Sequence, residues 1–309
     1  MKKVLAIVMT YNPENKNIFQ IWRSVIDSLI SQRKEDIAVD VVVCDNCSSV
    51  EARSALLGLQ KEREGLSLIF VDKRYPVNLL WNFAITLFDK ESYDYIIFNT
   101  SDCMFNEPDS LSVLIKDIEM NFEWIIISPQ VDNDMNMHWG HHIKYHGIIS
   151  PTRVDIGEGV NGHFHMFNQT YLKAFDYKRP DLLWGHRSEP LFPYLCASIN
   201  KQEVISHKVQ MHHVTAGKTR QGFEQYDKLM EEYGDWDKFL GMLRTRGRQL
   251  GLGFEELYGN DPKTVHHNDQ AFDGRGYAKT GELYEFIKKE LFLQPDQFSY
   301  SNIQYELLK

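Results

Sequence analysis

The stretch Tyr95-Ile96-Ile97-Phe98-Asn99-Thr100-Ser101-Asp102 decides the fold prediction, because an apolar run ends abruptly in a small polar cluster with one carboxylate. Such a run predicts a buried parallel strand. Open α/β sheets bind ligands at the carboxyl ends of these strands. We therefore expect Asp102 to face a cleft. A carboxylate there suits Mg²⁺ or Mn²⁺, with substrate phosphates completing the coordination.

The sequence on both sides of this stretch alternates short apolar runs with helical patterns. Strands are predicted at 4–9, 39–44, 66–71, 93–98 and 124–128, and helices at 19–30, 51–64, 77–88 and 109–121. Strands that alternate with helices imply βαβ units and a mainly parallel sheet with right-handed crossovers. The predicted fold class is therefore α/β.

The amino-acid composition of the chain changes after residue 130. Histidine, asparagine, glycine and aromatic residues become frequent over 132–168, which indicates an acceptor-side insertion with short strand pieces such as 164–167. The later segments are predicted as a helix, a loop and a helix, at 223–250, 259–280 and 284–293. We divide the chain into a nucleotide-binding and catalytic domain, residues 1–220, and a mostly helical C-terminal extension, residues 221–309.

Composition narrows the function classes. The 309 residues carry a net charge of −9, so a broad basic face for nucleic acid or anionic lipid is not expected. Four cysteines do not make a disulfide framework in a chain of this length. The first apolar run, residues 4–9, is too short for a signal peptide, and no later run reaches the roughly 20 apolar residues of a membrane span. We expect a cytoplasmic protein without a transmembrane segment.

Short motifs stand at the predicted strand ends and further along the chain. They are Thr10-Tyr11-Asn12, Asp45-Asn46-Cys47-Ser48, Asn78-Leu79-Leu80-Trp81-Asn82, Thr100-Ser101-Asp102, Gly162-His163-Phe164-His165-Met166, Ser188-Glu189 and His212-His213-Val214-Thr215-Ala216-Gly217. In this order and spacing, over residues 3–220, the chain resembles a GT-A fold glycosyltransferase of the broad family 2-like kind. The resemblance implies a nucleotide-diphosphate sugar as donor.

The resemblance also implies how the nucleotide is held, since residues at the first two strand ends bind the nucleoside in such folds. The predicted nucleotide-binding residues are Thr10, Tyr11, Asn12, Asp45, Asn82, Thr100 and Ser101. Asp45 is expected to bond to a base NH or a ribose hydroxyl. The alternative for Asp45 is a turn or helix-capping role, for which Asp-Asn-x-Ser is well suited.

Asp102 is the strongest metal-ligand candidate. Thr100 stands where the family has the first carboxylate of its D-x-D motif, so one charge is missing. His212 or His213 is predicted to add an imidazole, and such a mixed site suits Mn²⁺. Only one of the two is expected to reach the metal, because adjacent strand residues face opposite ways. The six histidines of residues 138–165 lack cysteine partners and an H-E-x-x-H helix, so zinc is not expected.

Glu189 is the predicted general base, which deprotonates the acceptor hydroxyl opposite the leaving diphosphate. Its alternative role is that of an acidic residue favoured at a helix N-terminus, with Pro190 in the first turn. Lys218 and Arg220 are predicted to neutralise the leaving phosphates. Their alternative is a solvated charge cluster.

The predicted function is a glycosyltransferase that moves a hexosyl or pentosyl group from a nucleotide-sugar, a UDP-sugar above all, to an acceptor hydroxyl. The acceptor stays open among a glycan, a lipid-linked sugar, a protein and a hydroxylated nucleobase. One alternative is a nucleotidyltransferase that makes sugar nucleotides, but residues 9–13 lack its Gly-rich phosphate loop. The other is a non-catalytic nucleotide-sugar-binding protein, which Thr100 in place of a carboxylate keeps open.

Overall fold

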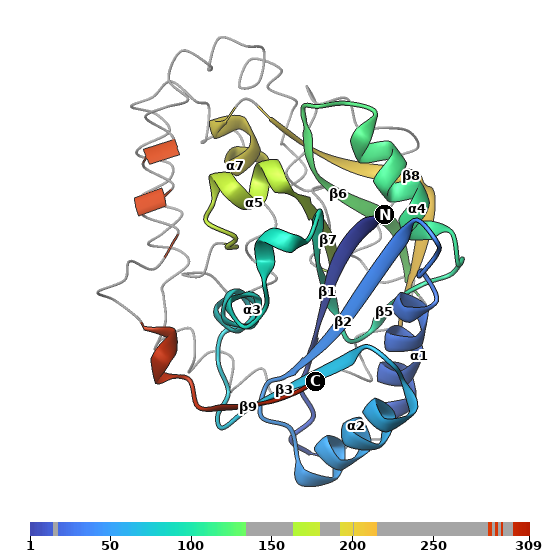
Figure 1. Cartoon of the computed structure of the whole chain (residues 1–309), viewed down its shortest axis with the longest axis vertical. Helices are drawn as coiled ribbons and strands as arrows, with labels where there is room; N and C mark the ends of the chain where they lie inside the picture. Colours follow the sequence, from blue (N-terminus) through green and yellow to red (C-terminus); the bar gives the residue numbers. More distant parts are fainter. Residues whose placement is uncertain are drawn as a thin grey trace, which may run out of the picture.

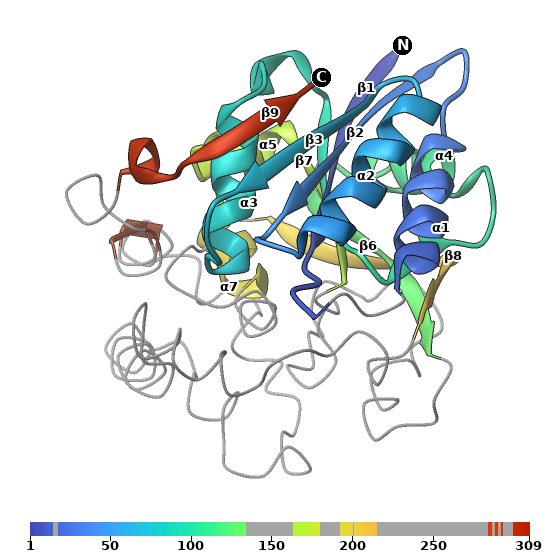
Figure 2. The same cartoon turned by 90° about the horizontal axis from the view of Figure 1, so that it is seen from below.

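The computed structural model describes the chain over residues 1–14, 18–133, 163–179, 192–199, 201–214, 284–285, 288–289, 292 and 299–309. Within these residues one sheet is covered by helices on both faces, so that the molecule has three layers (Figure 1 and Figure 2). No helix of the described part combines the length and apolar character needed to cross a membrane.

Nine strands of the described residues form the sheet. They are β1 (Lys2–Thr10), β2 (Ile37–Asp45), β3 (Leu66–Val71), β4 (Tyr95–Thr100), β5 (Cys103–Phe105), β6 (Trp124–Asn133), β7 (Phe164–Asn168), β8 (Gln202–His213) and β9 (Tyr305–Leu308). Their order in space is β5-β8-β6-β7-β4-β1-β2-β3-β9. The central strands β4, β1, β2 and β3 are parallel, which confirms the predicted α/β class.

The parallel register places the carboxyl ends of β4, β1 and β2 side by side. Met9 of β1 lies opposite Thr100 of β4, and Thr10 lies opposite Asp45 of β2. These strands read as continuous apolar runs because both faces of a parallel sheet are buried under helices. Three of the predicted site residues therefore meet at one edge of the sheet.

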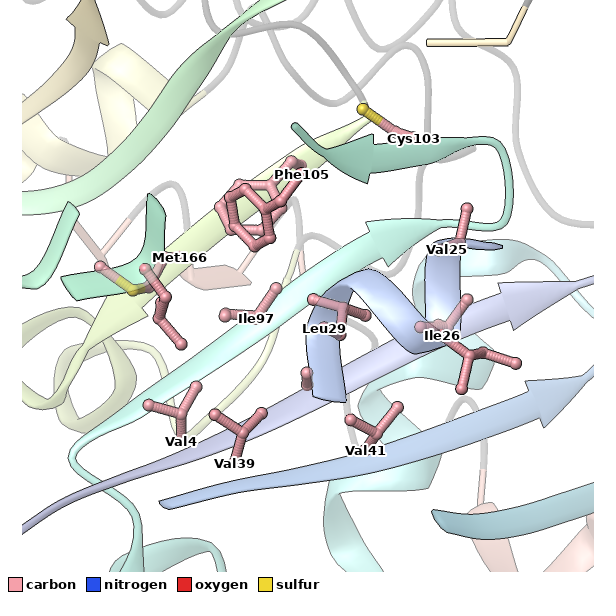
Figure 3. Packing of buried hydrophobic residues seen from close by; sticks show 14 of the residues in the cluster. Val4, Val25, Ile26, Leu29, Val39, Val41, Ile97, Cys103, Phe105 and Met166 are labelled. Carbon is pink, nitrogen blue, oxygen red and sulfur yellow. The ribbon is translucent and has the colours of Figure 1, made fainter. Parts of the chain in front are cut away.

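Two hydrophobic cores lie on the two faces of the sheet. The helices are α1 (Phe19–Ile30), α2 (Val50–Glu62), α3 (Val77–Thr86), α4 (Ser110–Glu119), α5 (Gln169–Ala174) and α7 (Phe192–Ser198). Side chains alternate along a strand, so Val4 of β1 packs in one core and Leu5 in the other. Figure 3 shows Val25 and Leu29 of α1 over the sheet residues of the core that contains Val4. Each such buried side chain contributes about 1.5–3 kcal/mol to stability.

Several elements differ from the sequence predictions. The piece 164–167, predicted within an insertion, is β7, an inner strand that runs antiparallel to β4 and β6. The strands β5, β8 and β9 were not predicted. Since β9 pairs with β3, residues 305–308 of the predicted C-terminal extension belong to the main sheet. The predicted helix 223–250 and loop 259–280 lie outside the described residues.

Candidate active site

The strand β4 ends in a tight turn that backbone hydrogen bonds hold between two other strands. Thr100 N donates to His163 O at 2.9 Å, which ties the turn to the start of β7. Val214 N donates to Asp102 O at 2.8 Å, which ties the turn to the end of β8. The position of Asp102 is therefore set by three strands that are far apart in the sequence.

Asp102, His163 and His213 converge at this turn. Their carboxylate oxygen and imidazole nitrogens lie within 4.8 Å of one another. His213 Nε2 is 3.4 Å from Asp102 Oδ2, and the rings of His163 and His213 stack with centroids 3.9 Å apart. One carboxylate and two imidazoles are ligands that Mn²⁺ and related divalent cations accept. By the chemistry of its donor atoms, the cluster fits the predicted metal.

The electrostatics of the cluster keep Asp102 ionised. Burial alone would raise the pKa of Asp102, but the hydrogen bond with His213 and the fields of His163 and His213 outweigh burial and hold this pKa well below its ordinary value. The side chain of Asp102 keeps 16% exposure, whereas that of His213 keeps 8%. A charged carboxylate is thus available at neutral pH at a partly open position.

The structure distinguishes the two adjacent histidines at the end of β8. His213 lies opposite Cys103 of β5 and belongs to the cluster, whereas His212 lies opposite Met104, one step along the ladder. Neighbouring residues of a strand point to opposite faces, and of these two histidines the cluster includes His213. His163 was not predicted as a ligand. The available signal was its place in the Gly162–Met166 motif, directly before the predicted strand piece 164–167.

Asp45, at the end of β2, has a different environment. Its carboxylate is fully buried and accepts hydrogen bonds from Thr10 Oγ1 at 3.1 Å, from Ser48 N at 3.0 Å, and from the Ser48 hydroxyl. Arg53 Nε adds an ion pair at 3.0 Å. Within the described residues the carboxylate therefore joins the ends of β1 and β2 to α2, as in the turn-forming role.

The next residue, Asn46, extends this framework to the loop after β3. Asn46 Oδ1 accepts from Tyr75 N, and Asn46 Nδ2 donates to Tyr75 O, both at 2.8 Å. The adjacent Arg74 places its guanidinium carbon 4.2 Å from the centroid of the Tyr11 ring. Burial raises the pKa of Tyr11, and Arg74 partly offsets that increase. Tyr11 and Arg74 thus form a half-buried aromatic–cation pair at the binding edge.

Arg74 was not predicted as a site residue. The sequence held a signal for it, because Arg74 follows a predicted strand as Tyr11 and Asp45 do. Asn12, which was predicted, is buried and receives its backbone contact from the same framework: Asn12 N donates to Ser48 Oγ at 2.7 Å. Ser101 lies half-buried in the turn after β4.

Asn82, which was predicted to bind the nucleotide, makes two hydrogen bonds to the backbone of a distant residue. It lies buried in α3, where its Nδ2 donates to Arg179 O and its Oδ1 accepts from Arg179 N, both at 2.8 Å. Arg179 is fully buried, with its guanidinium carbon 3.9 Å from the Phe98 ring centroid. The amide of Asn82 therefore holds the backbone after α5 in place.

The predicted general base and phosphate ligands lie outside the described residues. These are Glu189, Lys218 and Arg220.

Comparisons with known proteins agree with this architecture. The model of glycosyl transferase family 2 matches residues 6–180. The mannosyltransferase PcManGT from Pyrobaculum calidifontis, in complex with GDP-Man and Mn²⁺, is similar at a TM-score of 0.52 and 14% identity, over 94% of this chain and 76% of its own. S. aureus TarS 1–349 is similar at a TM-score of 0.53 and 15% identity, over 93% and 92%. No curated protein sequence matches significantly. The family match and these likenesses confirm the predicted GT-A fold.

Proposed function

We propose, from the premise that this chain belongs to glycosyl transferase family 2, that it transfers a sugar from a nucleotide-diphosphate donor to an acceptor hydroxyl with the help of a divalent cation. The family model covers more than half of the chain, which supports glycosyl transfer as the reaction. The observation that carries the cation is the cluster of Asp102, His163 and His213 at the carboxyl end of β4. Such a cation, when bound, supplies charge neutralisation for the leaving diphosphate.

Side chains of the protein are proposed to bind the nucleoside and the diphosphate and to remove the acceptor proton. Tyr11 and Arg74 lie at the ends of β1 and β3 and are proposed to hold the nucleoside, with the base stacked against this pair. Thr10, Asn12 and Ser101 are proposed to line the same edge. Lys218 and Arg220 are proposed to bind the diphosphate oxygens, and Glu189 to take the proton of the acceptor hydroxyl.

The nucleoside of the donor is proposed to be uridine, with guanosine as the first competitor to test. The similar PcManGT structure contains GDP-Man and Mn²⁺, which makes a nucleotide sugar with Mn²⁺ a suitable first probe for this chain. Glycans, lipid-linked sugars, proteins and hydroxylated nucleobases are the acceptor classes to screen.

A donor screen on the full chain tests the proposal. Thermal unfolding is recorded with UDP-glucose, UDP-N-acetylglucosamine and GDP-mannose, each with Mn²⁺ and with EDTA, because a ligand that binds only the folded state raises apparent stability. Donor consumption is measured in the same mixtures. We expect one donor to stabilise the protein and to be consumed only with the metal. A protein that no donor stabilises, and that consumes none, contradicts the proposed function.

The role of Glu189 is tested by Glu189→Gln, which keeps the size of the side chain and removes its basicity. A general base typically supplies 10²–10⁴-fold, so transfer should fall by about that factor while donor affinity is retained. Asp181→Asn is the matched control from the same segment. If Asp181→Asn shows the loss and Glu189→Gln does not, the base is Asp181.

A further inference from the structure

We propose that His163 is a third protein ligand of the cation, so that the site has two imidazoles and one carboxylate and binds Mn²⁺ and later first-row divalent ions in preference to Mg²⁺. The inference rests on the proposed function for the presence of a cation at this place. It adds His163 to the ligands predicted from the sequence, and a metal preference that follows from this additional imidazole.

The register of the sheet explains why His163 reaches this point. In the antiparallel pair β4–β7, Asn99 lies opposite Phe164, so the next residues along, Thr100 and His163, are neighbours across the two strands. The hydrogen bond from Thr100 N to His163 O confirms this pairing at 2.9 Å. Residues directly opposite each other on an antiparallel pair project to the same face, with Cβ atoms about 4.5–5.5 Å apart.

Thr100 is the position at which the D-x-D pattern lacks its first carboxylate. The chain therefore brings an imidazole from the neighbouring strand to the side of the missing oxygen ligand. His213 approaches from β8, since Cys103, the residue after Asp102, pairs with His213. Two imidazoles from two different strands thus flank a single carboxylate, and each is positioned by backbone pairing.

The distances and the burial suit coordination. The three potential donor atoms lie within 4.8 Å of one another, so each is within a short side-chain movement of a common point. His213 is nearly buried and Asp102 largely so, whereas His163 is half-buried. Burial excludes competing water and strengthens the attraction between Asp102 and a cation. The partial exposure of Asp102 and His163 leaves the cluster accessible from solvent.

The choice of ligand atoms determines the metal preference. Mg²⁺ takes oxygen ligands, loses its water reluctantly and relies on carboxylate charge. First-row transition ions accept imidazole nitrogens more readily than Mg²⁺ does, and the affinity of such a site rises from Mn²⁺, the weakest binder of the series, towards Co²⁺ and the later ions. The cluster offers one carboxylate and two imidazole nitrogens. It therefore supplies few of the oxygen ligands that Mg²⁺ requires, and it supplies the nitrogen ligands that first-row transition ions accept.

Metal affinity of the full chain tests the inference without any donor. Titration calorimetry with MnCl₂ and with MgCl₂ should show wild-type protein binding Mn²⁺ more tightly, by about tenfold or more. His163→Ala should weaken Mn²⁺ binding by about 10–100-fold, at least the loss expected even for an outer partner of a ligand. His163→Asp should bring the Mg²⁺ affinity closer to that of Mn²⁺, because it restores an oxygen ligand.

His212→Ala is the control, since it removes the imidazole next to His213 at the end of β8, which is outside the cluster. It should keep the wild-type Mn²⁺ affinity. Wild-type protein that binds Mg²⁺ as tightly as Mn²⁺, or His163→Ala protein with wild-type Mn²⁺ affinity, overturns the inference. A spectroscopic count on the unmutated chain covers the case in which a variant fails to fold. Electron spin-echo spectra of bound Mn²⁺ should show two coupled imidazole nitrogens, and a single coupled nitrogen overturns the proposed site with two imidazoles.

The outcomes of these metal-binding experiments can be distinguished from those of the donor screen. Protein that consumes a donor but shows one imidazole on Mn²⁺ refutes the metal inference and leaves the proposed function standing. Protein that shows two imidazoles but consumes no donor does the reverse.

Discussion

Asp45 and Asp102 occupy equivalent places in the sequence pattern, each following an apolar strand of the parallel sheet, yet their surroundings differ. Asp45 is fully buried, and its oxygens accept hydrogen bonds from Thr10, Ser48 and Arg53. Asp102 is partly exposed and faces two histidines. A carboxylate at a strand end is therefore not sufficient to define a ligand site. The groups that neighbouring strands bring to it decide between a structural and a chemical role.

The largest effect is expected at Asp102. Asp102→Asn keeps the shape and removes the charge that a cation needs. Transfer with Mn²⁺ should fall by about 10³-fold, since a bound metal supplies several kcal/mol of transition-state stabilisation. Turnover is measured at saturating donor, with Glu107→Gln, an exposed carboxylate outside the cluster, as the control. Equal turnover in both variants would place the metal elsewhere and remove the contrast between the two aspartates.

The second effect concerns stability at the other strand end. Asp45→Ala leaves Arg53 and two hydroxyls without a buried acceptor, and breaking a buried ion pair in this way costs about 3–5 kcal/mol. Urea unfolding should show a loss of about 3 kcal/mol, because Arg53 keeps some exposure. Asp40→Ala, at an exposed position of the same strand that accepts one hydrogen bond from Tyr93, should change stability by about 1 kcal/mol or less.

Nucleotide titration of the same Asp45→Ala protein sharpens the comparison. If Asp45 also bonds to a base or ribose, as the sequence predicts, the free energy of nucleotide binding weakens by the contribution of one charge-assisted hydrogen bond, about 1.5–3 kcal/mol. Unchanged affinity in a folded, destabilised variant restricts Asp45 to the turn.

Asn82 provides an intermediate case. Asn82→Ala removes both hydrogen bonds to the Arg179 backbone, so the free energy of unfolding should fall by about 2 kcal/mol, near 1 kcal/mol for each bond. Nucleotide affinity should stay within about twofold of wild type, because the amide bonds to the Arg179 backbone. A variant of normal stability with weakened nucleotide binding would return Asn82 to the role that the sequence predicted.

The smallest effect is expected at Arg74. A stacked guanidinium contributes about 1 kcal/mol, so Arg74→Ala should weaken nucleotide binding about fivefold. The neighbouring Lys73→Ala, which removes an exposed charge, is the control. If Arg74 contacts the base, the loss is the same for uridine, UMP and UDP. A loss that grows with the number of phosphates would assign Arg74 to the diphosphate.

The parts of the fold that were predicted correctly depend on local patterns. The strands β1 to β4 each combine a continuous apolar run with a polar turn, and helices with an apolar stripe separate them. Such signals lie within a few residues of one another. The strands β5 and β9 have three and four residues, which is too short for a periodic pattern. They form because distant strands, β8 and β3, offer unpaired edges.

The same distinction applies to the site. The position of Asp102 at the carboxyl edge of the sheet was predictable from the sequence, because the turn that carries it directly follows its own strand. His163 was not, since its role depends on β7 lying antiparallel beside β4 with Asn99 opposite Phe164. Nothing near His163 in the sequence specifies that register. The buried bonds of Asp45 likewise depend on Arg53, one helical turn into α2, folding back over the strand end.

By itself, the sequence determined that the chain forms an α/β sheet whose central strands are parallel, with polar residues at its carboxyl edge, because strand length, burial and turn chemistry are encoded in adjacent residues. Only the tertiary structure decided which polar residues meet. It joined Asp102 to His163 and His213, turned His212 away, and enclosed Asp45. The physical reason is that hydrogen-bond register between distant strands sets both the face and the neighbours of every side chain, and a shift of one residue would exchange them.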